Sequence, residues 1–138
     1  MSDDYEQCMV SNSRMAARAL TRRYDAYLRP FGLSAAQFSL LAAIATTPGE
    51  TVSRLAERRA FERTTLTRNL DTLEAMGLAA STRHGRGNGR IAEVTPKGRA
   101  LLAEALPSWR QAQQDLRNEL SDAAFDHSLD TLKRLAKV

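Results

Sequence analysis

The chain has few of the residues that form covalent cross-links or metal sites. Its 138 residues include one cysteine and two histidines. One cysteine cannot form a disulfide within the chain, and one cysteine with two widely spaced histidines cannot supply a Cys/His metal cage. We therefore expect no metal and no cofactor, and we expect the cytosol as the compartment.

Long apolar runs are lacking as well. No stretch of about 18 apolar residues occurs, so the sequence predicts no membrane-spanning helix. The first four residues, Met1 to Asp4, are acidic where a secretory signal is cationic and then apolar. We expect neither membrane association nor export.

Patterns typical of enzymes are also lacking. Glycines alternate at positions 85, 87 and 89, but a phosphate-binding loop requires a Gly-Lys-Ser/Thr helix start after it, and here we expect a strand. No Ser/His/Asp or paired-carboxylate arrangement stands out. An enzyme is one alternative class, and these absences lead us to expect that the chain is not one.

The middle of the chain concentrates positive charge. The net charge is +4, and residues 53–100 alone hold ten basic and five acidic residues. Seventeen of the twenty basic residues are arginine, whose planar guanidinium suits phosphates and guanine edges. A nucleic acid would suit this charge as a partner, and a solvated surface is the other interpretation.

Helical periodicity dominates the N-terminal part. Apolar residues recur at helical steps over residues 10–31, which predicts a long amphipathic helix. Ser34 and Gln37 have the spacing of a capping box before a second helix, which closes at Pro48-Gly49.

Two short helices in the basic middle have the outline of a helix-turn-helix. Thr51 is expected to cap the first, with Val52, Leu55 and Ala56 buried. The second ends at Gly77 and carries an apolar stripe at steps of four and three: Leu66, Leu70, Leu73 and Met76. Its first two turns are polar, so we expect its N-terminal end to face outward.

A hairpin and two more helices complete the expected elements. Residues 78–83 and 90–94 are expected to form two strands around a glycine-rich cationic tip, which would be a wing beside the helix-turn-helix. Thr95 and Pro96 begin a helix, in which Pro107 predicts a kink or break. Ser121 begins a last helix with one apolar side. The first and last two helices are more apolar than the winged part can cover, so we expect a two-fold dimer.

Several stretches match a pattern that is specific only in combination: Leu55 to Arg58, Arg63 to Leu78, Val94 to Gly98, and Gly-Leu-Ser-x-x-Gln-Phe at Gly32 to Phe38. Together they closely resemble the MarR family of bacterial winged-helix regulators, and the resemblance covers nearly the whole chain. It implies a mainly α-helical fold with a small β-hairpin wing. It also implies a dimeric DNA-binding repressor or activator, often with a small-molecule pocket between the dimerisation helices and the winged domain.

On this resemblance we expect one domain over residues 1–138. Residues 34–98 would form the winged helix-turn-helix, and residues 5–31 and 99–138 the flanking dimerisation helices. The chain departs from the family at the wing, where residues 83–90 lack the usual Asp-x-Arg pattern, and at the turn, where Ala60 replaces a glycine and Arg59 a leucine.

The predicted partner is double-stranded DNA with a pseudo-palindromic operator. In the helix-turn-helix we expect Arg63 and Arg68 to bind guanine edges, Asn69 an adenine edge, and Thr64, Thr65 and Thr67 phosphate or thymine methyl groups. Thr51 and Ser53 are expected at phosphates. The wing candidates for the minor groove are Arg83, His84, Arg86, Asn88 and Arg90. The other interpretation is that some of these side chains only cap helices or face solvent.

Two further expectations concern regulation, and one alternative concerns the partner. Four aromatic residues are candidates for a pocket that binds an aromatic or phenolic effector, or else belong to the core: Tyr24, Tyr27, Phe38 and Trp109. A branch of the family senses hydroperoxides through a cysteine near the start of the first helix, so a redox role for Cys8 is an alternative. The other alternative is a winged-helix protein-interaction module without DNA binding, which the arginine content disfavours.

Overall fold

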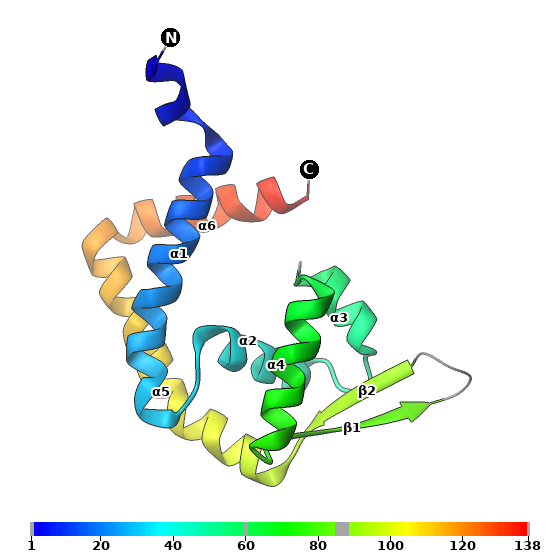
Figure 1. The fold of residues 1–138 in the computed structure, drawn as a ribbon. Helices are drawn as coiled ribbons and strands as arrows, with labels where there is room; N and C mark the ends of the chain where they lie inside the picture. The colour runs from blue at the N-terminus through cyan, green and yellow to red at the C-terminus, as the bar shows by residue number, and fades with distance from the viewer. Residues whose placement is uncertain (1, 60, 85–88, 138) are drawn as a thin grey trace.

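The computed structural model describes residues 2–59, 61–84 and 89–137, and within them the chain is mainly α-helical with one β-hairpin (Figure 1). The elements are η1 (Ser2–Gln7), α1 (Met9–Leu28), η2 (Arg29–Phe31), α2 (Ala35–Thr46), α3 (Val52–Arg58), α4 (Arg63–Ala75), β1 (Ala79–His84), β2 (Gly89–Val94), α5 (Pro96–Leu120) and α6 (Asp122–Ala136). The predicted fold class is confirmed.

The turn from α1 to α2 is capped from both sides. Gly32 has a φ of 70°, the left-handed conformation that favours glycine. Ser34 and Gln37 form the predicted capping box: the Ser34 hydroxyl accepts from the Gln37 N–H at 3.1 Å, and the Gln37 side chain accepts from the Ser34 N–H at 3.0 Å. Asp25 of α1 also accepts from the Ala35 N–H at 2.6 Å, which fixes the direction in which α2 leaves α1.

α2 lies at the centre of the core, in contact with α1, α4, α5 and β2. Leu40 and Leu41 of α2 are buried together with the predicted stripe of α4, Leu66, Leu70 and Leu73. Burying each such side chain contributes about 1.5–3 kcal/mol. The core therefore holds α4 by its leucine side and determines which side of that helix faces outward.

The hairpin is antiparallel, with a register that runs from Ala79 opposite Val94 to His84 opposite Gly89. The strands were predicted at residues 78–83 and 90–94 and lie at 79–84 and 89–94. Three of the four boundaries thus differ by one residue, and the end of β2 agrees. Thr51, just before α3, pairs with Ile91 of β2 as an isolated bridge. The start of α3 is therefore attached to the hairpin by backbone contact.

The Thr-Pro-Lys-Gly sequence at 95–98 joins β2 to α5 closely beneath the end of α4. The Thr95 hydroxyl accepts from the Gly98 N–H at 3.0 Å and donates to the Gly77 carbonyl at 2.7 Å. A Cβ added at Gly98 would overlap the Leu78 carbonyl oxygen, so this close approach requires glycine.

α5 is one helix from Pro96 to Leu120, so the break that Pro107 allowed does not occur; Figure 1 shows the helix changing direction partway along. α1 packs beside α5, and α6 turns away from α5 at the end of the molecule far from the hairpin. Ser121 makes that turn with a φ of 82°, which is unusual for a residue other than glycine, and its hydroxyl caps α6.

No single helix among the described residues has the length and apolarity to cross a membrane. Residues Met9–Phe31 and Ala35–Thr46 satisfy that test only when they are taken as a pair, and a bend of 75° separates them.

Candidate nucleic-acid interface

α4 separates an apolar side from a polar side. Leu66, Leu70 and Leu73 are at most 1% exposed. On the rest of its surface, four of the predicted DNA contacts are exposed, Arg63, Thr64, Thr65 and Arg68, and two are half-buried, Thr67 and Asn69. Arg63, Thr64, Thr67 and Arg68 border one shallow hollow together with Asp71. The structure thus brings most of the predicted contacts of this helix onto one outward face.

The start of α4 differs from the other helix starts in the winged region. Ser34, Thr51 and Thr95 each cap their own helix with a side-chain hydroxyl. Glu62, at the N-cap of α4, makes no capping hydrogen bond through its side chain. The first-turn N–H groups of a helix carry a partial positive charge and suit a phosphate. With Arg63 in that turn, this end of α4 favours an anion.

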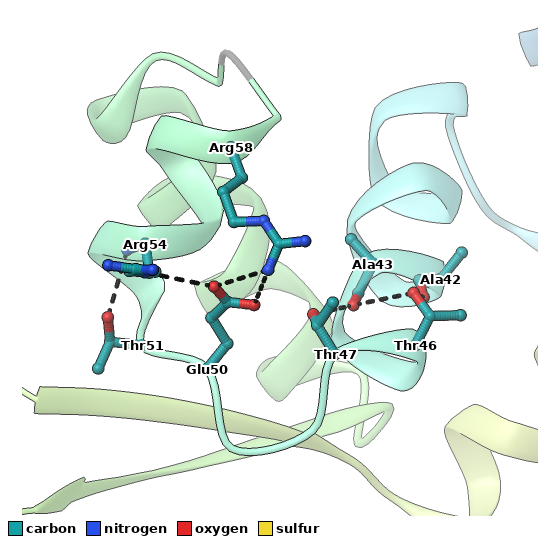
Figure 2. Close-up of polar contacts among 8 residues, drawn as sticks. All are labelled: Ala42, Ala43, Thr46, Thr47, Glu50, Thr51, Arg54 and Arg58. Carbon is teal, nitrogen blue, oxygen red and sulfur yellow. Dashed lines mark hydrogen bonds and ion pairs between the residues drawn. The ribbon is translucent and has the colours of Figure 1, made fainter.

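The turn between α2 and α3 is held by a carboxylate that sequence reasoning missed. Figure 2 shows Glu50 between the guanidinium groups of Arg54 and Arg58. Arg58 donates to both Glu50 oxygens at 3.0 and 2.7 Å, and Arg54 Nε lies 3.6 Å from the carboxylate. The Glu50 side chain is only 13% exposed. Glu50 therefore fixes the two arginines along α3 and offsets part of their charge.

The predicted phosphate contacts lie at the start of α3. The Thr51 oxygen accepts from the Arg54 N–H at 3.2 Å (Figure 2), so Thr51 has a structural role as a cap. Thr51 and Ser53 are both half-buried. A capping hydroxyl accepts through its oxygen and keeps its own proton for a second partner, so the cap is compatible with the predicted phosphate contact.

The wing candidates fall into three groups. Arg86 and Asn88 lie outside the described residues. Arg83 and His84 belong to β1, opposite Arg90 and Gly89 in the register. Arg90 is directed toward α4, where it forms ion pairs with Asp71 at 2.9 Å and Glu74 at 2.7 Å. Sequence reasoning treated Arg90 as a groove contact and did not identify Asp71, Glu74 or Ser81 as its partners.

The four aromatic candidates pack against protein groups in this structure. The Phe38 and Trp109 rings are stacked, with centroids 6.1 Å apart, and join α2 to α5. The Tyr24 and Tyr27 hydroxyls of α1 donate to Gln113 and Asp115 of α5. The four residues thus connect α1 and α2 to the same helix.

The polar seam between α1 and α5 perturbs several pKa values. Burial raises the pKa of Tyr24. The hydrogen bond to Asp115 raises the pKa of Tyr27 and, together with a bond from Gln111, lowers the pKa of Asp115. The neighbouring Arg23–Glu119 pair, at 2.8 Å, lowers the pKa of Glu119.

Cys8 stands at the N-cap of α1 and is half-buried. The pKa of its thiol is lowered, first by a hydrogen bond with the Ser11 backbone and then by the Ser11 side chain and the Val10 backbone. A redox role for Cys8 stays a prediction. In the described ranges, no three His, Cys, Asp or Glu side chains are grouped so that they could hold a metal.

Comparisons with known proteins identify relatives over nearly the whole chain. A sequence model of the MarR family matches residues 31–87. The M. tuberculosis transcriptional regulator MosR is 37% identical over 96% of this chain and 98% of its own, with a TM-score of 0.83. MosR in complex with DNA is 38% identical over 94% of each chain, with a TM-score of 0.84. Among curated proteins no sequence matches.

A second relative is a transcriptional repressor. CouR bound to a 23-mer DNA duplex is 27% identical over 96% of this chain and 95% of its own, with a TM-score of 0.83. CouR bound to p-coumaroyl-CoA is 26% identical over 95% and 93% of the two chains, with a TM-score of 0.84.

Proposed function

Because the chain belongs to the MarR family of transcriptional regulators, we propose that it is a homodimeric repressor that binds a pseudo-palindromic operator in double-stranded DNA. Such a protein would act in the cytoplasm, where it meets the chromosome. The DNA complexes of MosR and CouR, and the repressor activity of CouR, support this proposal.

The observation that carries the proposal is the outward polar face of α4. Arg63, Thr64, Thr65 and Arg68 are exposed while the leucines behind them are buried. An α-helix fits the major groove, where arginine pairs with guanine and threonine contacts phosphate or the thymine methyl group. We infer that α4 enters the major groove and that the hairpin reaches the adjacent minor groove.

The distribution of exposed apolar residues supports a homodimer. Eight large apolar side chains are exposed among the described residues, and all lie before residue 16 or after residue 119: Tyr5, Met9, Val10, Met15, Leu120, Leu129, Leu132 and Leu135. A second copy related by a two-fold axis would cover these surfaces and place two α4 helices at half-sites about 10 bp apart.

An aromatic effector is a second element of the proposal. Phe38 and Trp109 connect the winged region to α5, and Tyr24 and Tyr27 bring hydroxyls to the same helix. A ligand that separated these contacts would alter the position of the winged region relative to the dimer. The complex of CouR with p-coumaroyl-CoA supports this class of ligand. We expect p-coumarate or its CoA ester to change the fluorescence of Trp109, the chain's one tryptophan, and to release DNA.

The deciding experiment is a DNA-binding titration at several salt concentrations, with a duplex selected by the unmodified protein from a random library. If six to ten phosphates are neutralised per dimer, log K falls against log salt with a slope of about −5 to −9. We expect Arg68→Ala to weaken specific binding by about 1–3 kcal/mol with no change in the melting temperature. Arg110→Ala, which removes an exposed arginine of α5, is the matched control.

The alternatives give different results in the same experiment. A protein-interaction module would select no duplex and would show no salt-dependent binding. If Arg68→Ala bound the selected duplex as tightly as the unmodified protein, the assignment of Arg68 to a base edge would be wrong.

A further inference from the structure

Arg90 connects the hairpin to α4 through a closed set of side chains. Its Nη2 atom donates to Asp71 Oδ1 at 2.9 Å and to Glu74 Oε2 at 2.7 Å. Its Nε atom donates to the Ser81 hydroxyl at 3.0 Å, and that hydroxyl donates to Glu74 Oε1. Three side chains from α4 and β1 are thus joined around the guanidinium of Arg90 on β2, and we call these four residues the Arg90 network.

The exposure of these groups shows that the guanidinium is engaged by the protein. The Arg90 side chain is 22% exposed and that of Glu74 27%, whereas that of Asp71 is 62% exposed. Asp71 and Glu74 are three residues apart and therefore lie on the same face of the helix. Hydrogen bonds between ionised groups are stronger than neutral ones and, with two acceptors and a third partner, restrict the arginine to one orientation.

The charge of the network argues against a direct phosphate contact. One arginine is opposed by two carboxylates, so the network carries a net charge of −1 beside the polar face of α4. A negative charge at that place opposes DNA binding. The network would therefore weaken the electrostatic attraction between the protein and DNA. If the network favours DNA binding, it does so by fixing the orientation of the hairpin.

Arg90 lies near the tip of the hairpin, where a contact with α4 can restrict how the hairpin is oriented. Arg90 is paired with Arg83, one step before the last pair of the hairpin, His84 with Gly89. An isolated two-stranded hairpin is only marginally stable in water. The core holds its other end through Ala79 and Val94. Next to Arg90, the bridge between Ile91 and Thr51 attaches β2 to the start of α3. The Arg90 network attaches the same part of the hairpin to α4, and this connection limits the swing of the hairpin relative to α4.

We propose that Arg90 is a positioning residue, which sets the angle between the wing and α4 so that both match adjacent grooves, and that it contacts no phosphate itself. This inference rests on the proposed function above. It assigns to Asp71, Glu74 and Ser81 a role in DNA affinity although two of them carry the same charge as DNA.

The experiment compares four variants on the selected duplex across a range of salt concentrations. Glu74→Gln is decisive, because it removes a negative charge from the DNA-binding side and simple electrostatics would therefore strengthen binding. We expect it to weaken binding at least about fivefold at every salt concentration, which corresponds to about 1 kcal/mol. Glu93→Gln, on the exposed side of the same hairpin, is the matched control and should leave binding unchanged or strengthen it.

Two arginine variants separate positioning from phosphate contact. Each lost phosphate contact reduces the salt slope by about 0.9. We expect Arg90→Gln to weaken binding with no change in slope, and Arg90→Lys to behave like Arg90→Gln, because an ammonium keeps the charge but lacks the planar fork. A slope reduced by about 1.8 in Arg90→Gln, which is one lost contact in each protomer of the dimer, would overturn the proposal. Full affinity in Arg90→Lys, or unchanged or tighter binding by Glu74→Gln, would also overturn it.

Measurements without DNA keep this inference separate from the proposed function. Hydrogen exchange at the Ile91 and Ala92 amides of the free protein should become faster in both Arg90→Gln and Glu74→Gln, and remain unchanged in Glu93→Gln. If the unmodified protein selects no duplex, the proposed function fails. If the duplex is selected but exchange in the hairpin is unchanged, the positioning role of Arg90 fails.

Discussion

The winged region, residues 34–98, and the terminal helices differ in how much of their apolar surface is buried. In the winged region the large aliphatic side chains of α2, α3 and α4 are buried, and the exposed side chains are mostly polar. In the first part of α1 and in α6 most large apolar residues are exposed, whereas Leu28 at the end of α1 and Phe125 of α6 are buried. The apolar side chains of the terminal helices therefore need another surface to cover them, whereas those of the winged region do not.

The outer parts of the terminal helices are joined by several polar contacts, whereas Leu28 of α1 and Ala105 of α5 belong to the main core. Arg23 pairs with Glu119 between α1 and α5, and Arg117 lies over the Phe125 ring at 4.2 Å while pairing with Asp122 and Asp126. Exposed ion pairs contribute little to stability. We infer that the exposed apolar surfaces of α1 and α6 would be stabilised by the proposed dimer, whereas the winged region is stabilised by the core that it shares with Leu28 of α1 and Ala105 of α5.

The sharpest way to break this comparison is a charge on the exposed side of α6. Leu132 is 51% exposed in the single chain. In the proposed dimer Leu132→Asp would bury two unpaired carboxylates, each at a cost of several kcal/mol, so we expect the dimer dissociation constant to rise at least about 10³-fold. Sedimentation at several concentrations measures this.

The control for that variant is Lys133→Asp, which introduces the same carboxylate at the neighbouring residue and should leave the dimer intact. If Leu132→Asp still sediments as a dimer at micromolar concentration, α6 is not the covered surface. Circular dichroism of the variant should retain most of its helical signal, because the winged core does not depend on α6.

The second largest effect is expected in the core of the winged region. Leu70 is fully buried between α4 and the rest of the core. Leu70→Ala should lower the free energy of unfolding by about 2–5 kcal/mol, from lost burial and the cavity that remains. Chemical denaturation measures it, and Thr72→Ala, on the exposed side of the same helix, should change stability by no more than about 0.5 kcal/mol.

A steric test addresses the junction between the two regions. Gly98→Ala would place a Cβ against the Leu78 carbonyl oxygen and 2.8 Å from Val94 Cγ1, while the Gly98 N–H is held by Thr95. We expect a loss of about 1–3 kcal/mol from overpacking, measured by thermal unfolding. Ala100→Ser, at an exposed position of the same helix turn, is the control. Unchanged stability in Gly98→Ala would show that α5 can move away from the hairpin at no cost.

Much of the fold could be predicted because its signals are local. The caps at Ser34, Thr51 and Thr95 depend on residues three positions apart, and the leucine stripe of α4 repeats within one helix. The outward position of Arg63 and Arg68 follows from that stripe. At Pro107 the sequence predicted a kink or a break and could not distinguish them; the structure has one continuous helix that changes direction partway along (Figure 1).

The partners of Arg90 and Arg58 could not be predicted because they depend on tertiary geometry. Arg90 reaches Asp71 and Glu74 only because the hairpin folds back against α4. Arg58 reaches Glu50 across the first turns of α3, where the spacing of eight residues matches no single-turn rule. The sequence predicted Arg90 at the minor groove and counted Arg58 only in the net charge of the middle of the chain, whereas the fold pairs both arginines with carboxylates.

The smallest effect concerns pH and tests the seam between α1 and α5. Folding lowers the pKa values of Asp115 and Glu119 below their ordinary values of 3.8 and 4.5, through hydrogen bonds from Tyr27 and Arg23 respectively. The unfolded chain therefore binds these protons more readily than the folded chain. The stabilisation is fully present above the ordinary pKa values and is lost as the pH falls through the lowered pKa values.

Asp115→Asn keeps an acceptor for Tyr27 but cannot titrate, so it should flatten the fall of the melting temperature below about pH 4. Asp130→Asn, on the exposed side of α6, is the control, and an acid profile that Asp115→Asn leaves unchanged would place the acid-sensitive contacts outside this seam.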